Sequence, residues 1–273
     1  MNRREIRSRD GLMLVGYESG NPKGPEILFI HGFSQCSLAW EKQFSSEALA
    51  REFRLIAFDI RGHGASEKPS DLTRYADDAQ FAGDVRCVME AFKLKRPVLV
   101  GWSYAGRIIS DYVTAYGTGN IAGINYVCAR TKTDAAFNGR GTKLLRDMTS
   151  NDLSANIAAT RAFVRACYEK QPSAEEFETV LAYNMLVPPD IRGAHLSRPA
   201  SVGGVLPKLD VPVLVTQGGK DQLVLKGLGE FTAAVVPGAR LSMYEGIGHS
   251  PFAEDAARFN RELAEFVRAA QTH

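Results

Sequence analysis

The sequence predicts an α/β fold, in which helices cover both faces of a mostly parallel β-sheet. Short continuous apolar runs, typical of strands buried on both faces, recur at residues 27–30, 55–58, 97–100 and 213–216. Segments whose apolar residues recur at helical spacing lie between most of these runs. Strands that alternate with helices in this way form parallel sheets, and ligands bind such sheets at the carboxyl ends of the strands.

The elements follow in a simple order along the chain. Residues 4–9 and 12–18 predict a β-hairpin with a two-residue turn at Asp10-Gly11, and the strands at 27–30 and 55–58 come next. A helix with Phe81 and Val85 precedes the strand at 97–100, and the strand at 124–128 follows one helix later. The last strands are predicted at 213–216 and 241–244, each followed by a helix.

The alternation stops between about residue 131 and residue 199, where helix-like patterns continue without a convincing strand. Roughly seventy such residues are too many for a loop, so we expect an inserted helical lid. The predicted organisation is a core formed by residues 1–130 and 206–273, with the lid at 131–205.

Composition excludes several classes of partner. The chain has 273 residues and a net charge of +2, so no strong field favours nucleic acid or an anionic membrane. The arginines near the N-terminus alternate with other residues and predict a solvated edge strand. We therefore expect a small-molecule substrate, with homo-oligomerisation left open.

Cysteine spacing and hydropathy argue against a metal site and a membrane anchor. The four cysteines are scattered without C-x-x-C or Cys/His pairing, which predicts buried reduced thiols: Cys36, Cys87, Cys128 and Cys167. The N-terminus lacks an apolar signal core, and no run approaches the ~18 apolar residues of a membrane span. We expect a cytosolic, soluble protein.

One serine lies where a strand gives way to a helix. Ser103 follows the strand by two residues in Gly101-Trp102-Ser103-Tyr104-Ala105-Gly106, and an amphipathic helix begins at once. Such a sharp turn needs small neighbours, and it exposes the serine as a nucleophile elbow does. Ala105 stands where the G-x-S-x-G pattern has its second glycine. The alternative is an ordinary serine N-cap.

Two further residues complete a candidate catalytic triad. A serine hydroxyl needs a base, and a histidine serves when a carboxylate orients it. Asp221 and His249 each follow a later strand, so both should project from the same sheet edge as Ser103. Taken alone, Asp221 is also consistent with a turn or N-cap residue, and His249 with a loop histidine.

Other polar residues are weaker candidates for catalysis. Asp210 precedes its strand, and Asp134 falls in lid territory. We expect His31 and His63 to make structural hydrogen bonds, and Asp59 and Arg61 to organise their own turn. We expect His195 to lie at the surface or on a pocket wall.

The oxyanion of a tetrahedral intermediate also needs hydrogen-bond donors. The backbone N–H of Tyr104, next to the serine and at a helix N-terminus, is the natural first donor. Phe33, in the loop after the strand at 27–30, is the best-placed second donor.

These motifs together resemble the α/β-hydrolase superfamily over essentially the whole chain. The matching residues are His31-Gly32, Asp59 with Arg61-Gly62-His63-Gly64-Ala65-Ser66, the segment 101–106, Asp221 and Gly248-His249. Within the superfamily, the chain is similar to cofactor-free haloperoxidases and perhydrolase-like esterases, through Tyr116-Gly117-Thr118-Gly119, Tyr244-Glu245-Gly246 and 259–262. The resemblance implies an eight-stranded, mostly parallel sheet and a serine esterase without metal, haem or nicotinamide.

The function expected from these residues is cleavage of small carboxylic esters through an acyl-enzyme on Ser103. The same triad also serves perhydrolases, thioesterases, lactonases and carbon–carbon bond hydrolases, and some proteins of this fold are ligand receptors with little turnover. Ser34 stands where perhydrolases often have proline, which weighs against peracid chemistry.

Overall fold

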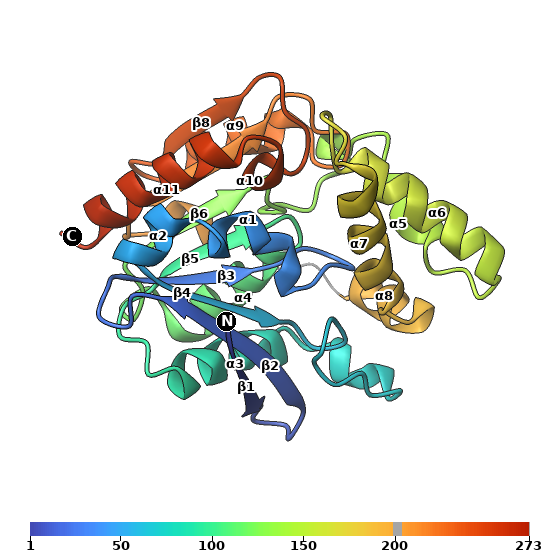
Figure 1. Ribbon diagram of the computed structural model, residues 1–273, viewed down its shortest axis with the longest axis horizontal. Coiled ribbons are helices and arrows are strands. Elements are labelled where there is room, and N and C mark those ends of the chain that lie inside the picture. The colour runs from blue at the N-terminus through green and yellow to red at the C-terminus, as the bar shows by residue number, and fades with distance from the viewer. Residues whose placement is uncertain (199–203, 273) are drawn as a thin grey trace.

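The computed structural model describes residues 1–198 and 204–272, which contain an eight-stranded sheet (Figure 1). The strand order is β1-β2-β4-β3-β5-β6-β7-β8. Strand β2 is antiparallel to both of its neighbours, and all other neighbouring strands are parallel. The mostly parallel α/β architecture is confirmed. The strands are β1 (Asn2–Arg7), β2 (Met13–Gly20), β3 (Glu26–Ile30), β4 (Arg54–Asp59), β5 (Val98–Trp102), β6 (Gly123–Val127), β7 (Val213–Gly218) and β8 (Arg240–Tyr244).

Side chains that alternate along the central strands divide the core into two layers. In β3, Leu28 and Ile30 belong to one apolar cluster, whereas Ile27 and Phe29 belong to the other. Helices therefore cover both faces of the sheet. The first cluster includes residues of α3 (Asp78–Ala91), α4 (Ala105–Tyr116) and α9 (Lys226–Val235), and the second includes residues of η1 (Ser37–Trp40), α1 (Glu41–Phe44), α2 (Glu47–Glu52), α10 (Pro251–Glu254) and α11 (Ala256–Ala270).

The N-terminal hairpin forms as predicted, but its turn is longer than two residues. Five residues separate β1 from β2, and Ser8 N–H donates to Leu12 O at 2.8 Å across the turn. The side chains of Ser8 and Asp10 also hydrogen-bond to each other, so polar side chains compete with the strand ladder here and widen the turn. The edge strand β1 is mostly exposed, as expected from its arginines.

The segment between β6 and β7 contains four α-helices and two short 3-10 helices in its described residues. In Figure 1, α5–α8 lie together at the right, beside the sheet. No strand is assigned within 131–198 or 204–212, which agrees with the expected helical insertion. Part of the predicted lid, residues 199–203, lies outside the described residues. The helices of this segment are η3 (Ala135–Phe137), α5 (Thr142–Asp147), α6 (Leu153–Ala166), α7 (Ala174–Met185), α8 (Pro189–Ser197) and η4 (Leu206–Lys208). One more short helix, η2 (Leu72–Tyr75), lies between β4 and α3.

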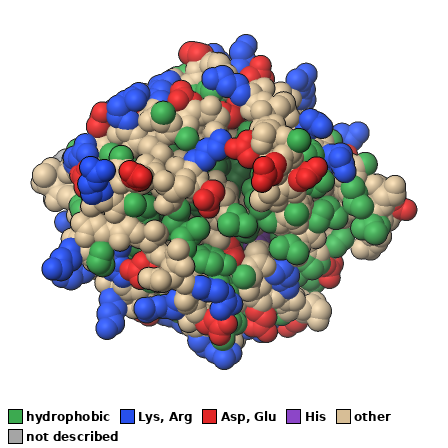
Figure 2. Space-filling view, in the orientation of Figure 1, with side chains coloured by type: hydrophobic (Ala, Val, Ile, Leu, Met, Phe, Trp, Pro, Cys, Tyr) green, Lys and Arg blue, Asp and Glu red, His purple; other side chains and the backbone are tan. Residues whose placement is uncertain are grey.

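Surface charge and cysteine burial also follow the sequence expectations. Figure 2 shows lysine and arginine interspersed with aspartate and glutamate over the face in view. All four cysteines are buried and unbridged. Among the helices of the described residues, none combines the length and apolarity needed to cross a bilayer. The expected cytosolic location stays a prediction.

Candidate active site

Ser103 occupies a strained turn between β5 and α4. Its φ of 56° lies in the left-handed region, which non-glycine residues seldom adopt. Backbone bonds hold the turn: Ser103 N–H donates to Val127 O at 2.9 Å, and Ser103 O accepts from Arg130 N–H at 2.8 Å. Helix α4 begins after Tyr104 without any side-chain cap, so the N-cap interpretation of the serine is not supported.

The steric demand for glycine in this turn falls on Gly101 and Gly106. A Cβ on Gly101 would lie 2.5 Å from the Ile109 Cδ1 atom, and one on Gly106 would lie 2.8 Å from the Ala129 Cβ atom. Ala105, in contrast, is accommodated as a fully buried residue at the start of α4. The departure of Ala105 from the G-x-S-x-G pattern therefore leaves the turn intact.

The structure brings Asp221 and His249 together. Asp221 follows β7 and His249 follows β8, and their Oδ2 and Nδ1 atoms lie 2.6 Å apart. The other oxygen of Asp221 accepts from the N–H groups of Leu223 at 2.8 Å and Val224 at 2.9 Å. The carboxylate is thus both a turn residue and the partner of the histidine, with its own loop holding it in place.

The loops that carry Ser103 and His249 are joined through Trp102. The Trp102 indole N–H donates to His249 O at 2.8 Å, and the two rings lie 5.5 Å apart. Within the described residues, the Ser103 hydroxyl makes no hydrogen bond, whether to His249 or to another group. Catalytic hydrogen bonds of this kind are often long before substrate binds.

A cavity of about 380 Å³ opens beside Ser103, a size that suits a small organic ligand. Its walls combine the turn before α4, the α5–α8 segment and the loop after β7. Apolar side chains and a few polar ones share the lining. Representative residues of these walls are Ser103, Tyr104, Phe163, His195, Leu223 and Val224.

Two backbone N–H groups near the serine are free of protein acceptors. Neither Phe33 N–H nor Tyr104 N–H donates a hydrogen bond to the described part of the chain. Both residues line the cavity that contains Ser103. The next residue, Ser34, has a φ of 60° and donates its N–H to His63 Nε2 at 3.1 Å. A proline could supply neither that dihedral angle nor that N–H.

The three histidines set aside by the sequence analysis form a buried cluster. His31 Nε2 accepts from Ile60 N–H at 3.0 Å, and His63 Nε2 accepts from Ser34 N–H, so both have the structural roles expected. Burial lowers the pKa of each. His195 is a pocket-wall residue with no exposed surface, and burial, followed by the nearby Arg198 charge, lowers its pKa to about 3.

Asp59 and Arg61 also have structural partners. Asp59 accepts from Ser37 N–H at 2.7 Å, which fixes the loop after β3. Arg61 reaches beyond its own turn and forms a buried pair with Asp84, with Nε–Oδ2 and Nη2–Oδ1 distances of 2.7 and 2.8 Å.

The weaker acid candidates lie away from His249. Asp134 caps η3, where Ala136 N–H donates to it at 3.0 Å. Asp210 precedes β7 and accepts from the Thr118 hydroxyl. Neither pairs with a histidine in the described structure.

Two of the triad candidates and a neighbouring cysteine could together offer ligands to a metal. The donor atoms of Cys128, Asp221 and His249 lie within 4.8 Å of one another. Burial, followed by the Asp221 charge, raises the pKa of the Cys128 thiol. A protonated thiol is a poor ligand, and the Asp221 oxygen nearest the histidine is already engaged, so this cluster fits a hydrogen-bonded pair better than a metal.

Sequence reasoning missed two residues that brace the site. The Arg130 guanidinium contacts Asn138, Thr142 and Leu223 O, which ties the strand end after β6 to the α5–α8 segment and the Asp221 loop. The Glu254 carboxylate accepts from Gly248 N–H at 3.0 Å. Neither residue belongs to a known motif, and their partners are backbone groups and side chains of other elements.

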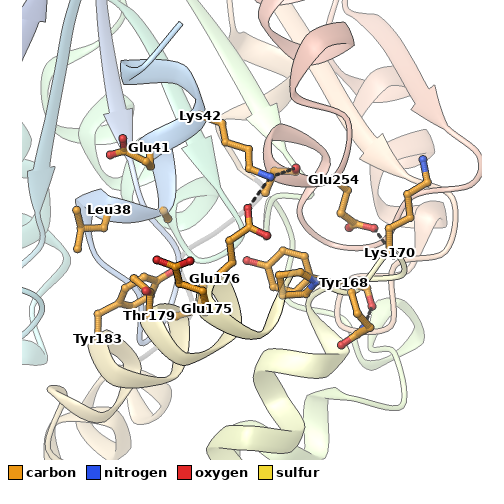
Figure 3. A pocket seen from close by; sticks show the side chains of 15 residues that line it. Leu38, Glu41, Lys42, Tyr168, Lys170, Glu175, Glu176, Thr179, Tyr183 and Glu254 are labelled. Atoms are coloured by element: carbon orange, nitrogen blue, oxygen red, sulfur yellow. Dashed lines mark hydrogen bonds and ion pairs between the residues drawn. The ribbon is translucent and has the colours of Figure 1, made fainter.

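A second cavity, of about 390 Å³, lies where α7 meets η1 and α1 (Figure 3). Lys42 Nζ lies 3.0 Å from Glu176 Oε1 there, joining the core to the α5–α8 segment. Glu254 borders this cavity and accepts from Glu169 and Lys170 N–H at 2.9 Å. Its lining includes none of the predicted triad residues, whereas the predicted nucleophile Ser103 lines the other cavity.

Comparisons with known proteins identify the family and the fold. A family model described as alpha/beta hydrolase fold matches residues 25–256. A crystal structure from Burkholderia cenocepacia, provisionally assigned as an aryl esterase, is 36% identical with a TM-score of 0.95 and full coverage of both chains. The Rhodococcus esterase RhEst1 is 33% identical with a TM-score of 0.92, covering 99% of this chain and 100% of its own. A bifunctional esterase/perhydrolase from Acinetobacter calcoaceticus is 28% identical over 97% of this chain and 99% of its own.

Proposed function

The chain belongs to the alpha/beta hydrolase-fold family, and from that premise we propose that it is a serine hydrolase that cleaves small carboxylic esters. Ser103 is the nucleophile, His249 the general base and acid, and Asp221 the carboxylate that orients the histidine. The observation that carries the proposal is the buried 2.6 Å hydrogen bond between Asp221 and His249, at the sheet edge where Ser103 occupies its strained turn.

The reaction proceeds in two steps. In the first step, His249 Nε2 takes the Ser103 proton as Oγ attacks the ester carbonyl, and the alcohol leaves with that proton. In the second step, His249 activates a water molecule, which attacks the acyl-enzyme and releases the acid and the free serine. The Phe33 and Tyr104 N–H groups stabilise the oxyanion of each tetrahedral intermediate. The α5–α8 segment acts as a lid that restricts water in the cavity.

Position 34 argues for hydrolysis over peracid formation. Ser34 has a positive φ, and its N–H bonds His63. A perhydrolase-type proline cannot occupy that conformation, so the loop next to Phe33 is organised differently from a proline-containing one. We place ester hydrolysis first on this ground.

Turnover of para-nitrophenyl acetate and butyrate tests the proposal, with Ser103→Ala as the matched variant. We expect many turnovers per molecule of the unmodified protein and loss of turnover in Ser103→Ala. A single stoichiometric release without further turnover would instead indicate a ligand receptor of this fold. Turnover that persists in Ser103→Ala would refute the role of this serine.

A further inference from the structure

Three arginines line the cavity beside Ser103. Among the described residues, its charged lining consists of Arg107, Arg130 and Arg198 against Asp134. Asp134 is itself paired with Lys132 at 3.2 Å. A substrate in this cavity therefore meets a positive surface, although the whole chain is nearly neutral.

Arg198 is the most deeply buried of these cations. Its side chain has no exposed surface, and its Nη2 lies 2.6 Å from Asp111 Oδ2. Among the described residues, its Nη1 has no hydrogen-bond partner. The guanidinium carbon stacks 4.0 Å from the centre of the Phe81 ring and 5.4 Å from that of Tyr104, the residue after Ser103. Burying a guanidinium with an unpaired N–H costs free energy unless an acceptor forms a hydrogen bond with that N–H.

Arg107, on the first turn of α4, lies beside Arg198. Its Nη1 donates to Arg198 O at 2.9 Å, and its Nε has no hydrogen-bond partner in the part of the chain that the structure describes. The Arg107 side chain retains about a tenth of its exposed surface, so it is the cation of this pair that a ligand in the cavity reaches first. Burial, followed by repulsion from Arg198, lowers the pKa of Arg107, as expected for two cations placed together.

The carboxylates near these arginines do not line the cavity. Asp111 pairs with Arg198, and Asp78 lies 3.3 Å from Arg107 and 3.2 Å from Arg198. Neither carboxylate is part of the cavity lining given by the described residues. Burial raises the pKa of Asp111, although the Arg198 guanidinium opposes this shift. The arginines, and not these carboxylates, therefore face a ligand in the cavity.

Resting on the proposed esterase function, we propose that the preferred substrates are esters that carry a second, ionised carboxylate, such as half-esters of dicarboxylic acids or esters of hydroxy acids. The substrate carboxylate binds at the Arg107/Arg198 end of the cavity while the ester carbonyl lies at Ser103. A charge-assisted hydrogen bond contributes about 1.5–3 kcal/mol, which corresponds to a preference of roughly ten- to a hundredfold.

Two matched substrate pairs test the proposal on the unmodified protein. Para-acetoxybenzoate is compared with para-acetoxybenzamide, and monoethyl glutarate with ethyl glutaramate, so that each pair differs only in the charge of one remote group. We expect kcat/KM to be at least about tenfold higher for the ionised ester in one pair or both. Equal or lower values for both ionised esters would overturn the proposal.

Binding of the reaction products separates this proposal from the esterase function. Calorimetry compares para-hydroxybenzoate with para-hydroxybenzamide, the phenol products of the first substrate pair, and requires no turnover. If no ester is hydrolysed but the anions bind more tightly, the proposed function fails and the anion site stands. If neutral esters are hydrolysed through Ser103 and no anion preference is found, only the anion site fails.

Arginine variants show which side chains cause the preference for the ionised ligand. Arg107→Gln and Arg198→Gln should each reduce the preference for the ionised ligand by about tenfold, whereas Arg146→Gln, on the exposed surface of α5, should leave it unchanged. Arg107→Gln is the decisive variant if Arg198→Gln does not fold, because Arg107 is not the partner of buried Asp111. A preference that survives Arg107→Gln at full size would contradict the assignment.

Discussion

Asp221 Oδ2 lies 2.6 Å from His249 Nδ1, and both side chains are almost completely buried. The contact bridges the loops after β7 and β8, which the parallel sheet brings to one edge. A carboxylate on Nδ1 leaves Nε2 as the proton acceptor, which is the tautomer that a general base for serine requires.

Asp221→Asn tests that relationship. The asparagine oxygen can still accept from Leu223 and Val224 N–H, while its amide N–H₂ would face His249 and favour the wrong tautomer. We expect kcat for para-nitrophenyl butyrate to fall by about 10⁴-fold with little change in the unfolding midpoint. Asp210→Asn, at an exposed acid before β7, serves as the control. A loss below tenfold would argue that Asp221 does not orient the base.

Gly106→Ala and Ala105→Gly form a matched pair on the turn. The new Cβ of Gly106→Ala would lie 2.8 Å from Ala129 Cβ and 3.0 Å from Arg130 N, so the strand end after β6 must shift. We expect a loss of about 1–3 kcal/mol in the free energy of unfolding, measured in urea. Ala105→Gly should cost no more than about 1 kcal/mol. A larger loss of unfolding free energy in Ala105→Gly than in Gly106→Ala would contradict the steric explanation of this turn.

Glu254→Gln probes how the histidine loop is held. The carboxylate accepts from Gly248 N–H, next to His249, and from Glu169 and Lys170 N–H in the α5–α8 segment. A glutamine has one acceptor oxygen fewer, so we expect His249 to be less well positioned and kcat to fall about 10- to 100-fold while KM changes little. Glu265→Gln, on the exposed face of α11, should behave as the unmodified protein. An effect confined to KM would rule out the positioning role.

The burial of His195 predicts an acid-sensitive contribution to stability. Its pKa is lowered from 6.5 to about 3, so below pH 6.5 the unfolded chain binds a proton that the folded protein does not. This contribution is therefore fully present above pH 6.5 and is lost as the pH falls towards 3. When the pH is lowered from 7 to 5, the free energy of unfolding should therefore fall by about 2 kcal/mol less in His195→Gln than in the unmodified protein. Parallel stability curves from urea titrations would refute this assignment.

Local sequence patterns predicted most of the fold. Apolar runs marked the central strands because residues buried on both faces of a sheet leave a continuous signal. The turn between β1 and β2 was predicted too short, because the competing bond between Ser8 and Asp10 leaves no periodic pattern. The helices of the insertion were visible from their helical spacing, and the structure adds a capping box formed by Ser173 and Glu176 at the start of α7.

Only part of the candidate site could be predicted from the sequence. Asp221 and His249 could be paired in advance because both follow parallel strands, whose ends share one edge. Arg107, Arg130, Arg198 and Glu254 could not, because their roles depend on burial and on partners that only the folded chain brings close. A surface arginine and a buried one look alike in sequence.

Covalent labelling by a fluorophosphonate, followed by intact mass and peptide mapping, tests the nucleophilic role of Ser103 most directly. We expect one label per chain, carried by the peptide that contains Ser103, and labelling at least about a hundredfold slower in His249→Ala. A label on another residue, or an unchanged rate in His249→Ala, would contradict it.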